Sequence, residues 1–321
     1  MELKDRLKQA LGTTYSIERE LGGGGMSRVF VAREIALGRV VVIKVLHAEM
    51  AGQVSAERFK REIMLAARLQ HPHIVPLLNA GELDGLPYFT MPFIDGLTLR
   101  ARIAQPGEFP LTDAIRILRE IASALAYAHE QGIVHRDIKP DNVLLSGGAA
   151  MVTDFGVAKA VMDSGTTGEF RTSLGVATGT PAYMAPEQAS ADPTTDHRAD
   201  IYALGALAYE ILAGQPPFSA RSTQALLAAQ VTVVPEQIMR RRSALPPALG
   251  ALVMRCLEKR PSDRPQSAGE IVAALDAITS RNSGAIAASP RRSMVTLIAV
   301  GLAILAIVAF LVWRARSTGH S

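Results

Sequence analysis

The spacing of apolar residues changes near residue 110. Before that point, short apolar runs predict β-strands at 29–31, 40–45 and 88–93, and one stretch with helical spacing, 56–69, interrupts them. After it, apolar residues recur every three or four positions, which predicts amphipathic helices. The predicted helices are 114–131, 201–213, 224–229, 249–257 and 267–279. A strand-rich part followed by a larger helical part favours an α+β fold with two lobes.

A different pattern closes the chain. Residues 294–313 carry no charge, and only Thr296 among them has a clearly polar side chain. As a helix this stretch would be about 30 Å long, the thickness of a bilayer core. Arg292 precedes it and Arg314 follows it, as interfacial anchors would. We expect a transmembrane helix here rather than a buried core helix, with a juxtamembrane linker at 280–293 and a short extracytoplasmic tail at 314–321.

Composition narrows the classes further. Of the 321 residues, 48% are hydrophobic, which suffices for a core and excludes a wholly disordered chain. The single cysteine, Cys256, excludes a disulfide scaffold and any multi-cysteine metal site. Residues 1–5 lack the apolar segment of a signal peptide, so none is expected.

The net charge of +4 does not indicate a nucleic-acid partner. Residues 1–280 hold 29 of the 34 Lys and Arg and all 30 Asp and Glu, so the excess lies in the last 41 residues. No broad basic surface is left to follow a phosphate backbone. The basic run 240–242 is interpreted as a solvated surface turn.

Two features of the strand-rich part are suited to phosphate groups. Residues 21–29 hold four consecutive glycines, which let backbone N–H groups approach a ligand, although a plain hairpin turn would also use them. Lys44 lies in an apolar run, where burial is costly unless the amine meets an anion; the alternative is an outward-pointing lysine. Glu62, in the predicted helix, is a candidate ion-pair partner that would orient Lys44; the alternative is a single charge on a helix face.

The stretch 135–142 is far more specific. It supplies Asp137, Lys139 and Asn142 in one short loop. Phosphoryl transfer needs a carboxylate that orients the attacking hydroxyl, a cation at the moving phosphoryl group and an amide oxygen for Mg²⁺. Asp154, in an Asp-Phe-Gly sequence after the strand-like run 150–153, offers a second metal carboxylate.

Together these motifs resemble, in order and spacing, those of protein kinases over residues 15–279. The Gly-Gly-Met loop, the Met-Ala-Pro-Glu-Gln run and the single membrane helix resemble the bacterial eukaryotic-like (Hanks-type) serine/threonine protein kinases. The resemblance implies a bilobal kinase-like fold, with an N-lobe at about 15–93 and a C-lobe at about 94–279, after an N-terminal segment 1–14. It also implies ATP, Mg²⁺ or Mn²⁺, and protein substrates.

The resemblance further implies a role for each matching residue. Asp137 is the catalytic base, Lys139 steadies the γ-phosphoryl group, and Asn142 and Asp154 hold the metal. ATP contacts are implied for Leu21, Gly22, Gly24, Gly25, Val29, Val42, Lys44, Glu62, Met91, Pro92, Ile94 and Leu144. Structural roles are implied for Arg136, Thr180, Glu187, Asp200 and Arg264, with Glu187 and Arg264 forming an ion pair.

Met91 falls at the gatekeeper position, and Pro92, which has no N–H, leaves its carbonyl and the Ile94 N–H as the expected adenine contacts. Lys139 and Thr180 together favour Ser/Thr over Tyr acceptors. Arg136, next to the catalytic base, favours activation by phosphate on the loop 154–187. The candidate phosphosites are Ser164, Thr166, Thr167, Thr172, Ser173 and Thr178, with Thr172 and Ser173 favoured by position.

Because ATP is cytoplasmic, the kinase part is expected to face the cytosol from a bacterial inner (plasma) membrane. The resemblance also allows a homodimer through the small lobe. Two alternatives stay open: a nucleotide-binding pseudokinase scaffold, and a small-molecule kinase. The first would lack an equivalent of Lys44, Asp137, Asn142 or Asp154, and the second generally lacks the platform at 179–187.

Overall fold

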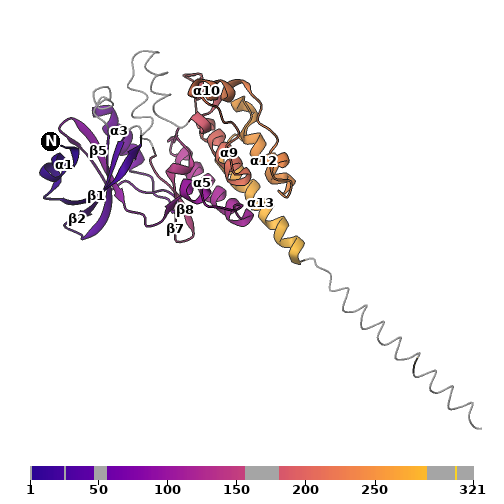
Figure 1. Cartoon of the computed structure of the whole chain (residues 1–321), viewed down its shortest axis with the longest axis horizontal. Coiled ribbons are helices and arrows are strands. Elements are labelled where there is room, and N and C mark those ends of the chain that lie inside the picture. Colours follow the sequence, from indigo (N-terminus) through magenta and orange to yellow (C-terminus); the bar gives the residue numbers. More distant parts are fainter. Residues whose placement is uncertain (1, 25–26, 47–55, 156–180, 288–307, 309–321) are drawn as a thin grey trace, which may run out of the picture. The chain divides into compact units, whose positions relative to one another are not determined.

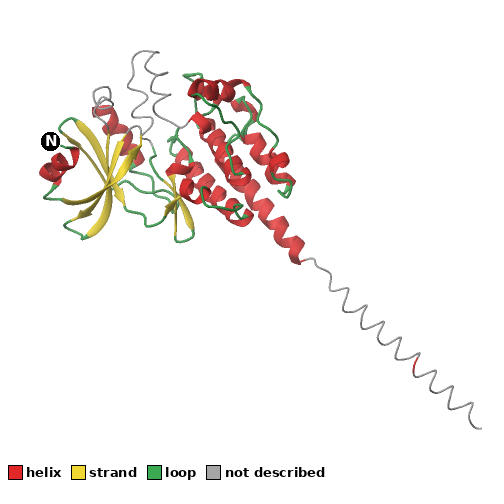
Figure 2. Cartoon of the chain, viewed as in Figure 1, coloured by secondary structure: helices red, strands yellow, loops and turns green. Residues whose placement is uncertain are grey.

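The computed structural model describes residues 2–24, 27–46, 56–155, 181–287 and 308. Contacts divide the chain into two units, Met1–Asp276 and Ala277–Ser321. The first unit contains a strand-rich lobe and a helical lobe (Figures 1 and 2). The predicted bilobal α+β fold is therefore confirmed.

The N-lobe is built on an antiparallel sheet with the strand order β1-β2-β3-β5-β4. The strands are β1 (Tyr15–Gly24), β2 (Ser27–Glu34), β3 (Arg39–Leu46), β4 (Asn79–Leu83) and β5 (Leu86–Pro92). The predicted strands 29–31, 40–45 and 88–93 correspond to β2, β3 and β5. β4 was not predicted, although Asp84 and Gly85 after it both have positive φ, as an Asp-Gly hairpin turn requires.

Both faces of the sheet are covered, which explains the continuous apolar run of β3. Alternate side chains point to opposite faces of a strand. Val41, Ile43 and Val45 are buried in one apolar cluster. Val42 and Leu46 are buried in a second cluster on the other face. Lys44 lies within this second set of positions, so its side chain leaves the strand on the same face as Val42.

A helix absent from the sequence prediction covers the first cluster. α1 (Leu3–Leu11) buries Leu7 completely and packs Leu3 and Leu11 against the same residues. Arg6 of α1 also forms an ion pair with Asp84, with Nη2 and Oδ2 2.9 Å apart. The segment 1–14 is thus an integral part of the lobe.

The helical lobe is organised around one buried helix. Its helices are α4 (Leu99–Ile103), α5 (Leu111–Glu130), α8 (Pro186–Ala189), α9 (Arg198–Ala213), α10 (Thr223–Thr232), α11 (Ile238–Arg241), α12 (Pro247–Cys256) and α13 (Ala268–Ala287). Nearly every residue of α9 is buried, and α5 and α12 pack against it. All five predicted C-lobe helices are present; α4, α8 and α11 are short and were not predicted.

A small sheet, β6 (Leu97–Thr98), β7 (Val143–Ser146) and β8 (Ala149–Val152), carries the loops of the site. Residues after α3 (Ala56–Ala66) reach this sheet: the N–H of Val75 donates to Val152, and the N–H of Val152 donates to His73. α3 ends three residues before the predicted end at 69, where the chain makes a turn and buries Leu69.

Among the described residues, no helix is long and apolar enough to cross a membrane. The predicted span 294–313 lies outside them except for Val308, as does the tail 314–321. α13 continues to Ala287, so residues 280–287 of the predicted linker are helical.

Candidate active site

The loop between α5 and β7 brings together the three polar residues that its sequence predicted. Lys139 Nζ donates to Asp137 Oδ2 over 2.7 Å. Asn142 Nδ2 donates to the backbone oxygen of Asp137 over 2.8 Å and to its Oδ2 over 3.0 Å. The 3₁₀ turn Pro140–Asn142 sets this arrangement, because it folds the chain back toward Asp137. The carboxylate, the ammonium group and the amide therefore lie at one point.

Asp200 of α9 anchors the catalytic loop, the segment 135–142. Its carboxylate accepts the backbone N–H groups of His135 and Arg136 over 2.8 and 2.7 Å, and it lies 2.8 Å from His129 Nε2. These bonds support Arg136 in a left-handed conformation, with φ of 67°. Burial opposes ionisation of Asp200, but the bonds and charge of His129 and the His135 N–H outweigh it and lower the pKa of Asp200.

This lowered pKa predicts a pH-dependent contribution to stability. Ionised Asp200 stabilises the fold above the ordinary carboxyl pKa of about 3.9, and that stabilisation is lost as pH falls through the lower folded pKa. We expect Asp200→Asn to be less stable than the wild type near neutral pH, with the difference shrinking below about pH 4. Urea unfolding at a series of pH values measures this; a difference that stays constant with pH would contradict it.

Across the two lobes, Lys44 Nζ forms an ion pair with Asp154 Oδ2. Their side chains are only 19% and 13% exposed, so solvent screens the pair weakly. Lys44 thus points toward the site, and the alternative of an outward-facing lysine is wrong. Glu62 is buried on α3, and its predicted pairing with Lys44 stays a prediction.

The segment before Asp154 is locked to the catalytic loop. His135 Nε2 lies 2.8 Å from the Thr153 oxygen, and the N–H of Thr153 donates to the Asn142 oxygen over 3.0 Å. The ring of Phe155 packs edge-on against His135. Asp154 has φ of 69°, and these contacts hold it in that conformation. The two predicted metal ligands, Asn142 and Asp154, are therefore coupled through Thr153.

The donor set fits a divalent cation. Asp154 Oδ1 is buried and has no hydrogen-bond partner among the described residues, which is costly unless a cation binds there. Asn142 turns its Nδ2 toward Asp137, so its Oδ1 is the atom that would face a cation. No group of three His, Cys, Asp or Glu side chains gathers in the described part of the chain. Mg²⁺ typically binds to only one or two protein side chains when phosphates and waters complete its coordination shell.

Five of the predicted ATP contacts gather in one apolar cluster. Val42 and Met91 are buried there, and Val29, Ile94 and Leu144 pack against them. Met151, which pairs with Leu144 across β7 and β8, belongs to the same cluster and was missed by the sequence analysis. The N–H of Phe93 donates to Val40, and Pro92 pairs with Val41 at the end of β5.

The glycine-rich turn joins β1 and β2. Gly22 has φ of 104°, which a side chain would strain, and it pairs with Val29. Leu21 beside it is 46% exposed, and Gly24 pairs with Ser27. Several predicted residues lie outside the described part of the chain: Gly25, Ser164, Thr166, Thr167, Thr172, Ser173, Thr178 and Thr180.

The structure places Glu187 and Arg264 in the predicted ion pair. Arg264 is fully buried, and its Nη1 and Nη2 lie 2.6 and 2.7 Å from the two carboxylate oxygens of Glu187. It also donates to the backbone oxygens of Arg198, Glu258 and Lys259. One side chain therefore ties the start of α8 to the start of α9 and the turn after α12.

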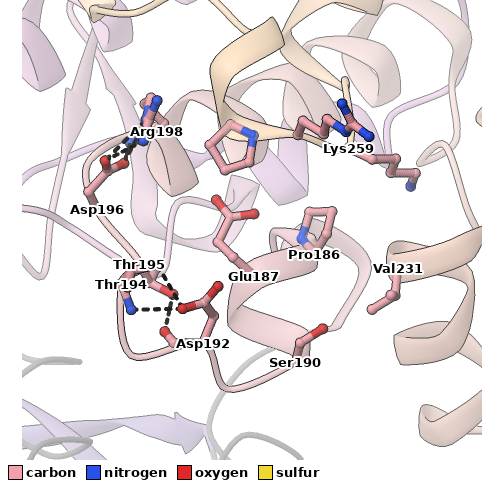
Figure 3. A pocket seen from close by; sticks show the side chains of 12 residues that line it. Pro186, Glu187, Ser190, Asp192, Thr194, Thr195, Asp196, Arg198, Val231 and Lys259 are labelled. Atoms are coloured by element: carbon pink, nitrogen blue, oxygen red, sulfur yellow. Dashed lines mark hydrogen bonds and ion pairs between the residues drawn. The ribbon is translucent and has the colours of Figure 1, made fainter.

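A pocket of about 320 Å³ lies beside this ion pair. Figure 3 shows Glu187 and Pro186 on one side of it and Lys259 on another, with the Asp196–Arg198 bonds at its edge. None of Lys44, Asp137, Asn142 and Asp154 lines it, so it is distinct from the catalytic cluster.

Two residues that support the loop were also missed by the sequence analysis. Gln188, next to Glu187, donates from Nε2 to the Arg136 oxygen over 3.0 Å and links α8 to the catalytic loop. His129 lies on the last turn of α5, and its position in the helical pattern does not predict its contact with Asp200. Each is a polar residue whose partner is distant in the sequence.

Comparison with known proteins identifies the family. The protein kinase domain model matches residues 15–274. The serine/threonine-protein kinase PknB of Mycolicibacterium smegmatis is 41% identical over 273 residues, covering 83% of this chain and 43% of that protein. PknB of Mycobacterium leprae is 40% identical, with the same coverage. The serine/threonine-protein kinase PknD of Mycobacterium tuberculosis is 40% identical over 269 residues, with 83% and 40% covered.

The chain thus aligns with about two fifths of the length of these curated relatives. Within this chain, the match includes both lobes and every polar group of the cluster around Asp137 and Asp154. The chain belongs to the protein kinase family, and the relatives named above are serine/threonine-protein kinases.

Proposed function

We propose that this chain is an active serine/threonine protein kinase. It transfers the γ-phosphoryl group of ATP to Ser/Thr hydroxyls of proteins, including its own loop between Asp154 and Glu187. The observation that carries the proposal is the joint placement of Lys44, Asp137, Asn142 and Asp154 with Lys139 in two connected sets of polar contacts. A pseudokinase scaffold, the alternative, would lack one of the first four.

The geometry supports a role for each residue. Asp137 accepts a hydrogen bond from the substrate hydroxyl and orients the hydroxyl oxygen for attack. Lys139, whose Nζ lies 2.7 Å from Asp137 Oδ2, supplies positive charge at the phosphoryl group that is transferred. Lys44 would exchange its contact with Asp154 for the α- and β-phosphates. Asn142 and Asp154 would hold Mg²⁺ or Mn²⁺, which neutralises phosphate charge when bound.

Transfer to an acceptor protein tests the proposal. The full chain in mild detergent, with Mg²⁺ and γ-labelled ATP, should label a generic Ser/Thr-rich acceptor protein. Adding a chelator should abolish the labelling, and Mg²⁺ or Mn²⁺ in excess should restore it. Binding of ATP without transfer to any acceptor would instead support the scaffold.

We further propose that residues 294–313 anchor the chain in the inner (plasma) membrane, with the kinase domain in the cytoplasm. The uncharged length of this stretch and the arginines that flank it support the anchor. A homodimer through the small lobe stays a prediction of the family resemblance.

Charge placed within the stretch tests the anchor. Ile304→Arg with Leu305→Arg should move the protein from the alkali-resistant membrane pellet to the supernatant, because each arginine costs about 3 kcal/mol at the centre of a span. Ala288→Arg, in the linker, should leave it in the pellet. A wild-type chain that alkali extracts completely would contradict the anchor.

A further inference from the structure

Arg100 of α4 stands at the centre of a second charged cluster. Its Nη1 donates to Glu210 Oε1 over 2.6 Å, its Nη2 donates to the hydroxyl of Tyr183, and its Nε lies 3.4 Å from Asp141 Oδ2. Tyr183 in turn donates its hydroxyl proton to Glu210 Oε2. One guanidinium group thus joins α4, the catalytic loop, the segment before α8 and α9.

This cluster borders the place where a substrate must bind. Asp141 lies in the catalytic loop, directly before Asn142 and two residues after Lys139. Lys139 and Asn142 both donate hydrogen bonds to Asp137 Oδ2. An acceptor hydroxyl has to come within hydrogen-bond reach of Asp137. Substrate residues two or three positions from the acceptor then lie about 7–10 Å away. The side chain of such a residue is long enough to reach the cluster.

Without Arg100 the cluster would be a cation site. Glu210 is only 6% exposed, and a buried carboxylate needs a positive partner. Asp141 is 46% exposed and contributes a second negative charge at the solvent side. Burial and then Glu210 raise the pKa of Tyr183, so this hydroxyl is neutral and serves as a donor. These groups fit a guanidinium, whose planar fork matches carboxylate oxygens.

Arg100 is placed to fill that site from solvent. Its side chain remains 36% exposed, although its tip contacts three polar groups. Burial works against its charge, but the bonds to Tyr183 and Glu210 outweigh burial and raise the pKa of Arg100. Both carboxylates are already in contact with this guanidinium when a substrate arrives.

We propose that Arg100 determines substrate specificity. Its guanidinium occupies the Asp141–Glu210 site in cis, so the enzyme gains nothing from a basic side chain near the acceptor residue of a substrate. In a chain without Arg100, an arginine of the substrate takes its place. This inference rests on the proposed kinase activity, and a purely structural clamp between α4 and α9 is the alternative reading of the same contacts.

Paired peptides test the proposal. One peptide carries a Thr acceptor among alanines and glycines, and four others add a single arginine two or three positions before or after it. For the wild type, we expect kcat/KM to be the same within about twofold for all five. For Arg100→Ala, at least one arginine peptide should gain tenfold or more over the parent peptide, mainly through a lower KM. Arg100→Gln, which keeps a hydrogen-bond donor for Glu210, should show the same selectivity and guards against misfolding of Arg100→Ala.

Two controls make the test specific. Arg102→Ala removes an arginine of the same helix that stacks on Phe109 at 4.6 Å, and it should show no selectivity. Adding Glu210→Gln to Arg100→Ala should abolish the gain, since the buried charge that attracts arginine is gone. Folded, active Arg100 variants that treat all five peptides alike would overturn the proposal.

A binding measurement separates this inference from the proposed activity. Fluorescence anisotropy of the labelled peptides reports the ratio of their Kd values without any phosphoryl transfer. If the wild type phosphorylates neither itself nor any acceptor, the proposed function fails, and the Kd ratio still decides the role of Arg100. A tenfold tighter arginine peptide with Arg100→Ala supports the proposal, and equal Kd values reject it.

Discussion

Asp137→Asn should lower kcat for phosphoryl transfer by about 10²–10⁴. Asparagine has nearly the shape of aspartate, and its side-chain oxygen can still accept from Lys139 and Asn142, which donate over 2.7 and 3.0 Å in the wild type. The asparagine side chain cannot take up the proton of the substrate hydroxyl, and it carries no negative charge. The fold and the affinity for ATP should therefore be unchanged.

Steady-state transfer to an acceptor peptide measures the effect, and nucleotide binding confirms that the site is intact. Asp113→Asn serves as the control, because Asp113 is a half-exposed residue on α5 that pairs with Arg116 at 3.6 Å. It should retain wild-type kcat. Full activity of Asp137→Asn would remove Asp137 from the reaction.

Arg264→Met should lower the free energy of unfolding by about 3–5 kcal/mol. The substitution leaves Glu187 as a buried carboxylate without its cation, and it removes the donors of three backbone oxygens. The guanidinium also packs over the ring of Tyr202 at 5.0 Å, and methionine replaces only part of that contact. The loss should fall on the whole helical lobe, since Arg264 joins three of its segments.

Urea unfolding, with the folded fraction measured by pulse proteolysis, gives the change in the free energy of unfolding. The matched control is Arg119→Met, which breaks a pair with Asp276 whose side chains are 45% and 48% exposed. That variant should lose only about 0–1 kcal/mol. Adding Glu187→Met to Arg264→Met should restore part of the stability, because no unpaired buried charge is left. Equal losses for Arg264→Met and Arg119→Met would contradict the structural role of the buried pair.

The sequence alone predicted the elements with strong local patterns. The apolar run of β3 and the long helix α5 show their periodicity directly, and the cluster Asp137, Lys139 and Asn142 lies within six residues of chain. Such residues are held together by one turn, so spacing is enough to place them. The glycine-rich turn between β1 and β2 followed for the same reason.

Several features that depend on packing between distant segments escaped prediction, although the family resemblance did imply the pair Glu187–Arg264. Leu3, Leu7 and Leu11 have helical spacing, but so short a helix is stable only against the sheet that it covers. Lys44 meets Asp154 across 110 residues of chain. Arg100 lies equally far from Glu210 along the chain, and nothing in the local sequence of either residue predicts their contact.

The most direct test of the central claim is phosphoamino-acid analysis with site mapping. The wild-type chain and Asp137→Asn are incubated in detergent with Mg²⁺ and γ-labelled ATP, and labelled residues are identified by mass spectrometry. The account predicts phosphothreonine and phosphoserine within the loop 154–187 of the wild type and none in Asp137→Asn. Bound ATP with no labelled residue in the wild type, or label on tyrosine alone, would contradict a serine/threonine kinase.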